Sequence, residues 1–564
     1  MKNKYSIFGL LAVVLYLVGC QEDFLERPPK DTLVDANFYK TDDQVLAGTA
    51  ALYSVVWKDY SDKSLINLGD FRGGTVYRAW NDRDNVLFNT TAVSPRNGEA
   101  YRSFFNVVGQ ANVAISNINE YAGSAVSDEI RQHAIGEARF MRATAYTYLV
   151  MNYGAVPIIE DNIALLADSS KTRNTVESVW EFITRDFLFA AENLMEVAPE
   201  EGRVTRWSAE GMLARTYLTR AGVGSTDGSK NQQYLDLAKQ YAESVIQNSG
   251  HSLLNDYADL FLFPYDNNEE SLFELQWVYT TDYSAANTMV SQITFSNDIA
   301  NGDGWGGDIG ASYWMLSLYD GLIQTDGSPG FTLDKRLKAS FMLPGFHYPE
   351  ITQTVRDDEG NASEQELIFP APATDAWVSF ASPKKYVVGK AKDLQKNGGN
   401  ATAQRYPNNT YMLRLAEIYL IYAEAELGNN ATTTDAQALA YFNEVHMRAG
   451  LPEFIDPLTW DIIYEERCKE FAMEGMSWYD LVRLHYFNPQ KAYNIVNTQD
   501  RGFYVVEPNQ MPDATAWTVE KNLDATEERF ATANSGNFLL PIPAAEASQA
   551  PNLLKPAVPY EFGE

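Results

Sequence analysis

The sequence predicts a mainly α-helical fold in which paired helices are followed by a loop-rich, partly irregular second part. Apolar residues recur with the 3.6-residue period of a helix in several long segments between residues 41 and 250. That periodicity fades over residues 250–410, where Gly, Pro, Asn and Trp become frequent, and it returns from residue 412. Of the 564 residues 45% are hydrophobic and 21% charged, which provides for a core of normal size.

The first twenty residues predict export and lipid attachment. Lys2 and Lys4 precede an apolar run, residues 7–18, which is too short for a membrane span of about 20 residues and is typical of a signal peptide. Residues 17–20 (LVGC) resemble a lipobox, so we expect residues 1–19 to be removed and Cys20 to be acylated. An ordinary secretory signal with a chance cysteine is the alternative.

Acylation of Cys20 would anchor the protein stably, because each buried methylene contributes about 0.8 kcal/mol and several acyl chains act together. The acidic residues 21–23 (QED) resemble the export tag that carries some lipoproteins to the cell surface, and a plain soluble tether is the alternative. We therefore predict an outer-membrane protein, exposed at the cell surface and anchored through Cys20.

The composition excludes several classes of function. Lys and Arg total 44 against 75 Asp and Glu, and the resulting charge of −31 would repel nucleic acids and anionic membrane surfaces. Two cysteines, Cys20 and Cys468, exclude a disulfide scaffold and a thiolate zinc cluster. The five histidines are scattered, and the sequence contains no GxSxG, HExxH or P-loop motif. No motif for catalysis or for a cofactor is therefore present.

Residues 20–250 are predicted to form a helical part, which begins with a polar tether. Residues 41–44 (TDDQ) are a capping box before a helix over residues 45–57, whereas residues 61–98, rich in Gly, Asn, Asp and Arg, are expected to be loops. Gly154 and the proline three residues later predict a helix end. Further helices are expected at residues 101–121, 128–153, 176–194, 208–220 and 234–246. Pairs of such helices at roughly 34-residue spacing are similar to tetratricopeptide repeats.

Residues 251–564 are predicted to form the loop-rich part of the same fold. Short strands are expected at residues 271–278 and 385–388. Long loops in a compact protein are commonly functional, so this region is expected to contribute to a site. Later helices are expected at residues 412–427, 436–449, 462–474 and 478–484, and the last thirty residues form an irregular tail.

Four segments of the sequence together carry a family resemblance. They are residues 137–143 (EARFMRA) leading to 153–157 (YGAVP); 414–420 (RLAEIYL) with 423–425 (AEA); 466–483, with its Glu, Arg, Trp and Asp positions; and 540–543 (LPIP) with Glu546, Pro551 and Asn552. These segments resemble the SusD/RagB family, surface lipoproteins that capture nutrients for a TonB-dependent transporter. The third segment is the most specific, and the tail after the fourth departs from the family's usual ending.

The resemblance implies a mostly helical fold with tetratricopeptide-like pairs and no enzyme activity. It also implies that the protein sits as a lid over a SusC-like transporter barrel. Several charged residues in the third segment recur at helical spacing, and we expect them to form an internal ion-pair network rather than a site. They are Glu466, Arg467, Glu470, Asp480 and Arg483.

Two loops have the composition of a sugar-binding surface. An exposed indole can stack on the apolar face of a sugar ring, while neighbouring Asn, Asp and Arg side chains bond its hydroxyl rim. The first loop, residues 71–85, contributes the candidates Arg72, Tyr77, Trp80, Asn81 and Asp82. The second loop, residues 301–308, contributes Trp305 and is followed by Tyr313 and Trp314.

Each tryptophan has an alternative role as a plug in the core. For Trp80 both roles remain open; the flanking glycines favour an exposed Trp305, and the apolar run after Trp314 favours burial of that ring. Asp35 and Asn37 precede the first helix, where they could reach ligand hydroxyls or serve as a turn or cap. Tyr386, next to two lysines, is a further candidate ligand contact.

We expect no organic cofactor. Residues 301–304 (NGDG) resemble part of a calcium loop, but Ile299 and Gly310 stand where an EF-hand needs acidic residues, which leaves only a looser structural calcium site. The sequence thus predicts a non-enzymatic surface protein that binds oligosaccharides and passes them to a SusC-like transporter. The alternatives are a peptide-binding protein of the RagB type, a lid with little ligand affinity and, less favoured, a glycoside hydrolase, for which no carboxylate pair stands out.

Overall fold

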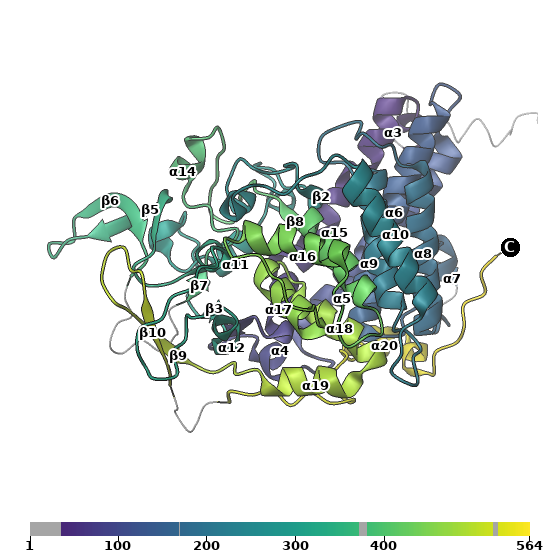
Figure 1. Cartoon of the computed structure of the whole chain (residues 1–564). Coiled ribbons are helices and arrows are strands. Elements are labelled where there is room, and N and C mark those ends of the chain that lie inside the picture. The colour runs from purple at the N-terminus through teal and green to yellow at the C-terminus, as the bar shows by residue number, and fades with distance from the viewer. Residues whose placement is uncertain (1–34, 168–169, 371–380, 523–527, 564) are drawn as a thin grey trace, which may run out of the picture.

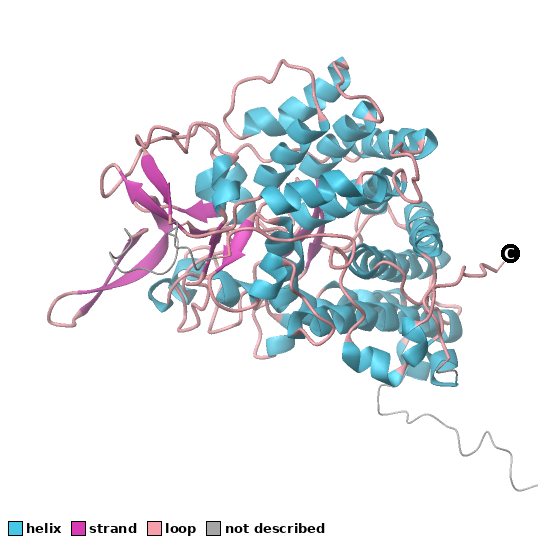
Figure 2. Ribbon diagram, turned by 90° about the horizontal axis from the view of Figure 1, so that it is seen from below, coloured by secondary structure: helices cyan, strands magenta, loops and turns pink. Residues whose placement is uncertain are grey.

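A computed structural model of the chain describes residues 35–167, 170–370, 381–522 and 528–563. The predicted signal peptide and Cys20 lie outside the described residues. Long helices fill one side of the molecule in Figure 1, and short strands and hairpins lie toward the other side. The view from below in Figure 2 shows the same division, with one hairpin projecting from the strand-rich side.

The helical side is a row of helices in which each packs on its neighbour along the chain. Helix α5 (Pro95–Tyr121) packs on α6 (Asp128–Tyr153), α6 on α8 (Val176–Asn193), α8 on α9 (Arg206–Arg220) and α9 on α10 (Gln232–Asn248). The row continues from α10 to α15 (Leu415–Leu427) and then α16 (Ala436–Arg448), so it crosses into the second part of the chain. The mainly helical fold and these helices are confirmed.

Local signals explain where these helices begin and end. The side chains of Ser127, Thr175, Thr205 and Asn231 each accept a hydrogen bond from the backbone N–H three residues on, which satisfies one of the free donors of the first turn. Gly154, with φ of 70°, ends α6 in a conformation that only glycine adopts at little cost.

The prediction of loops over residues 61–98 is wrong. This segment contains two buried π-helical segments, η4 (Tyr60–Ser64) and η5 (Ile66–Phe71), then strand β1 (Val76–Arg78) and α4 (Arg83–Leu87). Its glycines serve close packing, because a Cβ on Gly69 would lie 2.2 Å from the Gly475 Cα. Contacts with a segment four hundred residues away therefore override the loop-like composition.

Other expected elements are displaced. The helix over residues 45–57 is α3 (Asp42–Thr49), which continues as the 3₁₀ segments η2 (Ala50–Tyr53) and η3 (Val55–Trp57). The strand expected at residues 385–388 is wrong, because the strand lies earlier, at β7 (Ser382–Pro383), and Tyr386 occupies a turn with φ of 66°. The helix expected from residue 412 begins at Leu415, since residues 410–414 form a strand.

The strands of the described residues form five two-stranded antiparallel sheets. The pairs are β1 with β3 (Ile309–Ala311); β2 (Ser271–Leu275) with β8 (Thr410–Arg414); β4 (Phe341–Met342) with β7; β5 (His347–Arg356) with β6 (Ala362–Ile368), the projecting hairpin; and β9 (Tyr504–Pro508) with β10 (Trp517–Lys521). The remaining elements are α2 (Asp35–Phe38), α7 (Asn162–Ala167), η6 (Tyr257–Phe261), η7 (Tyr283–Ala285), α11 (Met289–Ile293), η8 (Asn297–Ile299), α12 (Tyr313–Ser317), α13 (Arg336–Ser340), α14 (Ala391–Gln395), α17 (Trp460–Glu470), α18 (Ser477–Phe487), α19 (Pro489–Thr498), α20 (Ala544–Gln549) and η9 (Pro551–Leu554).

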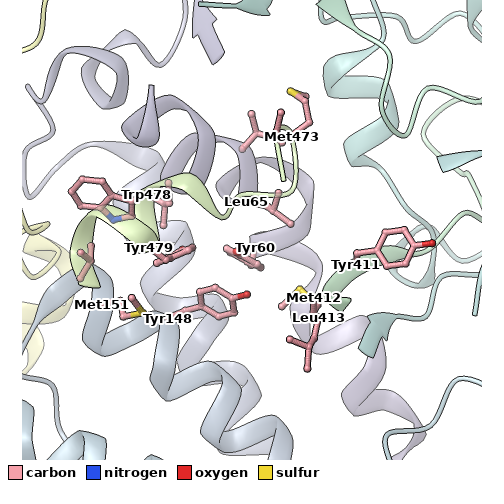
Figure 3. Close-up of a cluster of buried hydrophobic side chains, with 14 of the residues drawn as sticks. Tyr60, Leu65, Tyr148, Met151, Tyr411, Met412, Leu413, Met473, Trp478 and Tyr479 are labelled. Carbon is pink, nitrogen blue, oxygen red and sulfur yellow. The ribbon is translucent and has the colours of Figure 1, made fainter. Parts of the chain in front are cut away.

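One hydrophobic core joins the two parts of the chain. Tyr148 of α6 lies between Tyr60 of η4 and Tyr479 of α18, with ring centroids 5.2 and 5.0 Å away. Figure 3 shows these rings beside Met151 and Trp478. These contacts anchor η4, which precedes the first aromatic loop, directly on α6.

A buried network of ion pairs runs through α15, α17 and α18. Arg414 bonds Glu270, Glu470 and Glu474, and Arg467 and Arg483 both bond Asp480. Burial alone would raise the pKa of Glu470, but Arg448, Arg414 and Arg336 outweigh it and hold that pKa at about 2. The predicted internal ion-pair network is confirmed.

Candidate functional site

The pairing of β1 with β3 brings the two aromatic loops together. Arg78 lies opposite Ile309 in this ribbon, and the Ala79 N–H donates to the Asp308 carbonyl at 2.8 Å. In an antiparallel pair the residues after Arg78 and those before Ile309 leave the same end. The loops of Trp80 and Trp305 therefore leave the same end of a short ribbon; Figure 1 labels its strand β3 and the helix α4 that follows the first loop.

Both tryptophans are exposed. The exposed fraction is 61% for Trp80 and 45% for Trp305, whereas Trp57, Trp180 and Trp478 are fully buried. Large apolar side chains held in solvent on neighbouring loops are a mark of an interaction surface. The role of core plug, left open for Trp80, does not fit its position.

Trp80 lies in a tight turn that closes over α4. The Arg83 guanidinium donates to the carbonyls of Arg78 and Ala79 at 3.2 and 3.4 Å. Asp82 has φ of 52°, a left-handed conformation that aspartate tolerates better than most residues. This closed turn presents the indole from a braced backbone rather than from a free loop.

The loop of Trp305 is fixed on its inner side by α11 and the residues that follow it. The Trp305 N–H donates to the Ser291 carbonyl at 3.0 Å, and the Gly306 N–H to the Thr294 carbonyl at 2.8 Å. A Cβ on Gly306 would lie 2.4 Å from the Ile293 carbonyl oxygen. The glycine thus permits close packing of the loop on the protein, and the indole is left facing outward.

Tyr283, on η7, is a third exposed ring that we did not predict. It is 43% exposed, and the Lys58 ammonium lies 4.3 Å from its ring centroid and donates to the Ala286 carbonyl at 2.7 Å. Thr288, just before α11, donates to Asp62 of η4. Tyr283 lies on the segment that leads into α11, and the loop of Trp305 bonds Ser291 of α11, so α11 connects the segments of these two rings. We name Trp80, Tyr283 and Trp305 the aromatic surface.

Of the polar candidates in the first loop, Asn81 is exposed beside Trp80. The Asp82 carboxylate instead receives Arg78 at 3.0 Å and Arg96 at 3.2 Å, so it supports the turn. The Asp308 carboxylate likewise receives the Arg78 Nε–H at 2.9 Å. Direct contact with a ligand is therefore expected from Asn81, and Asp82 is reassigned to the support of the loop.

Three predicted ligand contacts are wrong because the structure buries them. Arg72 is enclosed between Phe88 and Trp478, with its guanidinium carbon 4.4 and 4.3 Å from the ring centroids. Tyr77 packs against aromatic rings of the C-terminal part, and Tyr386 lies in the core below β8. Within the first loop, the chain passes from the interior to the surface only after Tyr77.

Tyr313 and Trp314 are half-buried on α12, at the opposite end of the ribbon, where the Ser312 N–H donates to the Thr75 carbonyl. The Lys521 ammonium lies 4.5 Å from the Tyr313 ring centroid, and Trp314 stacks on Tyr464 at 6.4 Å. The strand thus carries them to the other end of the ribbon from Trp305, and their contact with a ligand stays a prediction.

Asp35 and Asn37 also lie elsewhere. They belong to α2, which contacts α5, and Lys40 donates to the carbonyl of Tyr121 at the C-terminal end of α5. The first loop bonds Arg96 at the other end of that helix. A helix of 27 residues is about 40 Å long, so these two residues cannot share a ligand with Trp80.

The aspartate of the predicted calcium loop bonds other groups of the protein. Asp303 is buried and accepts hydrogen bonds from Ser291, Gln404 and Tyr406. Within the described ranges, no cluster of three or more His, Cys, Asp or Glu side chains is arranged to hold a metal ion. Calcium binding remains a prediction. In the same described part of the chain, no helix is both long and apolar enough to cross a membrane.

Comparison with known families identifies the class. The model of the SusD family matches residues 269–559, and a second model, described as starch-binding and associating with the outer membrane, matches residues 23–218. The chain belongs to the SusD family.

Known relatives cover the whole chain. A SusD-like protein of Bacteroides ovatus is 34% identical over 576 residues, covering 100% of this chain and 99% of the relative. The starch-binding protein SusD of Bacteroides thetaiotaomicron is 24% identical over 66% of this chain and 68% of its own. A crystal structure with xylogluco-oligosaccharide has a TM-score of 0.80 and 33% identity, covering 92% of this chain and 100% of that one.

Proposed function

We propose that this protein is a surface glycan-binding protein in which the aromatic surface receives a hydroxylated chain. The exposure of Trp80 and Trp305 on loops joined by the β1–β3 ribbon carries this proposal. The face of a sugar ring is apolar and stacks on an indole, and the polar neighbours, Asn81 among them, bond the hydroxyls. The role is binding rather than catalysis, in keeping with a family described by the binding of starch.

Xylogluco-oligosaccharide is the first ligand to test. The similar structure determined with this ligand shares 33% identity and a TM-score of 0.80 with this chain. Calorimetry with xylogluco-oligosaccharide, with a laminarin oligosaccharide and with a peptide mixture as alternatives, tests the proposal. A heat of binding that a saccharide gives with the wild type and not with Trp80→Ala supports the proposal. Binding of peptide alone would replace it with a RagB-type function.

The proposed setting is the cell surface, with the chain attached through Cys20 and docked on a SusC-like transporter. Family membership and the LVGC motif at residues 17–20 support both parts. Cys20→Ala should move the protein from the outer-membrane fraction into the soluble fraction. A variant that stays in the membrane and still incorporates labelled fatty acid would overturn the anchor.

The transporter is tested separately. A permanent complex buries on the order of 2,000 Å² or more, so gentle detergent extraction should recover both proteins together. Recovery of the lipoprotein alone at native expression would count against the docked arrangement without affecting the glycan proposal.

A further inference from the structure

Arg78 joins the two tryptophan loops through its side chain. Its Nε–H donates to Asp308 Oδ2 at 2.9 Å, and its Nη1–H donates to Asp82 Oδ2 at 3.0 Å. Asp82 follows Trp80 by two residues, and Asp308 follows Trp305 by three. One guanidinium thus holds the loop of each exposed indole.

The ion pairs of Arg78 are shielded from water and fixed in orientation. The side chains of Arg78 and Asp308 are 13% and 5% exposed, so water competes little for this pair. A guanidinium presents its donors in a rigid plane, and charge-assisted bonds from such a fork define orientation as well as distance. Arg96 supplies a second donor to Asp82, which keeps that carboxylate in place when it accepts from Arg78.

The backbone hydrogen bonds between the two loops do not reach as far as the bonds of the Arg78 side chain. Strands β1 and β3 contribute three residues each, and the last backbone bond of the ribbon is the one between Ala79 and Asp308. Each loop has its own support, from Arg83 on one side and from Ser291 and Thr294 on the other. In addition to the Ala79 backbone bond, the Arg78 side chain couples one loop to the other through Asp82 and Asp308.

We propose that Arg78 is a positioning residue that locks the two tryptophan loops into one rigid platform, so that binding depends on ligand length. This inference rests on the proposed glycan function. A chain long enough to stack on both rings gains from their fixed separation, because its second contact is made at a high effective concentration and no loop must be ordered. A ligand that covers one ring gains nothing from the coupling.

Arg78→Met tests the link with xylogluco-oligosaccharides of one and of several repeats, measured by calorimetry. We expect affinity for the long ligand to fall by about tenfold or more, and affinity for the short ligand to change by less than about twofold. Arg78→Lys retains the charge but not the planar fork, so it should recover part of the loss. Arg206→Met, which removes another arginine bonded to two carboxylates, on α9, is the matched control and should leave both affinities unchanged.

A double-mutant cycle reports the coupling itself. Trp80→Ala and Trp305→Ala should be strongly non-additive for the long ligand in the wild-type background and nearly additive with Arg78→Met. Asp308→Asn, which weakens the same link from the other side, provides a second variant should Arg78→Met fold poorly. Equal losses for short and long ligands, or an unchanged affinity for the long one, would overturn the role of Arg78. No binding of either ligand by the wild type would instead overturn the glycan proposal for this ligand, on which the inference rests.

Discussion

The buried ion-pair network and the aromatic surface use the same chemistry for different ends. In the network, Arg414 of β8 is fully buried and bonds three carboxylates, one of them on α17. At the aromatic surface, Arg78 bonds two carboxylates and orders loops whose indoles face solvent. The most specific sequence motif of the family encodes the first region, and short loops encode the second. Family motifs here specify the scaffold, while the ligand-facing residues lie where no such motif exists.

The largest effect is expected from Arg414→Met. Breaking a buried ion pair leaves uncompensated charge and typically costs about 3–5 kcal/mol, and here Glu270, Glu470 and Glu474 would lose a shared partner. Urea denaturation should show this loss, whereas Arg206→Met on the surface should cost less than about 1 kcal/mol. Equal stability of the two variants would show that the network does not differ from surface ion pairs.

Trp80→Ala should lower glycan affinity and leave stability nearly unchanged. Truncation of a central stacking ring costs about 2 kcal/mol or more, which is a loss of more than tenfold in glycan affinity. Since Trp80 is largely exposed, the melting temperature should barely change. Trp305→Ala should behave in the same way.

Trp478→Ala is the matched control for these variants. This ring is fully buried against Phe88 and Phe538, so its removal should cost about 3–5 kcal/mol of stability. Trp314→Ala should also act mainly on stability. A Trp80→Ala protein that unfolds, or that binds normally, would remove the contrast between the two regions.

The sequence predicted the regular part of the fold because that part is local. Helix α6 has a capping serine, a sustained apolar period and a terminal glycine, and it was placed at residues 128–153, as observed. The segment around η5 was missed because its structure depends on contact with Gly475, which no local pattern reveals. Periodicity identifies an amphipathic helix, whereas a glycine-rich segment buried on all sides resembles a loop.

The aromatic surface could be predicted only in part. Loop composition identified Trp80 and Trp305, but the same composition selected Arg72, which follows η5, and Tyr77 of β1, and both of these side chains are buried. Tyr283 was missed because its neighbours include no glycine or tryptophan, although exposed polar residues surround it. The pairing of β1 with β3 is a long-range contact, and it decides which residues of each loop face solvent.

A smaller effect is expected in the pH dependence of the free energy of unfolding. Burial, with a contribution from Glu274, raises the pKa of Asp266 to about 7 in the folded protein. The folded state therefore binds this proton more tightly than the unfolded chain, and the stabilisation is complete below pH of about 4 and lost as pH rises through 7. Between pH of about 4 and 7, the free energy of unfolding should fall by up to about 1.4 kcal/mol per pH unit because of this group.

Asp266→Asn should flatten this slope, since the amide stays neutral and its oxygen can still accept from the Asn409 N–H. Asp70, whose pKa burial also raises to about 7, should account for the part of the pH slope that remains. Asp227→Asn, at an exposed turn, is the control and should leave the slope intact. Urea titrations at several pH values measure these slopes, and an unaltered slope in Asp266→Asn would contradict the assignment.

The smallest effect concerns Lys58 beneath Tyr283. Burial lowers the pKa of Lys58 to about 8, against the opposing influence of Asp62, Asp59 and Asp282. Its ammonium lies 4.3 Å from the Tyr283 ring centroid, and a cation–π contact of this kind contributes about 0.5–1 kcal/mol. As pH rises through 8, Lys58 loses its charge and the ring loses this support, while burial keeps the pKa of the Tyr283 phenol above 10.

Glycan affinity of the wild type should therefore fall by a few-fold between pH 7 and 9, roughly, since about 0.5–1 kcal/mol corresponds to a factor of two to five. Lys58→Met should show the reduced affinity already at pH 7 and no further fall, because the methionine side chain fills similar space without charge. Lys239→Met, on α10, removes a lysine paired with Glu426 and should retain the wild-type profile. A pH-independent wild type, or a Lys58→Met protein with the wild-type decline, would show that Tyr283 is held by packing alone and that the charge beneath the ring plays no part in binding.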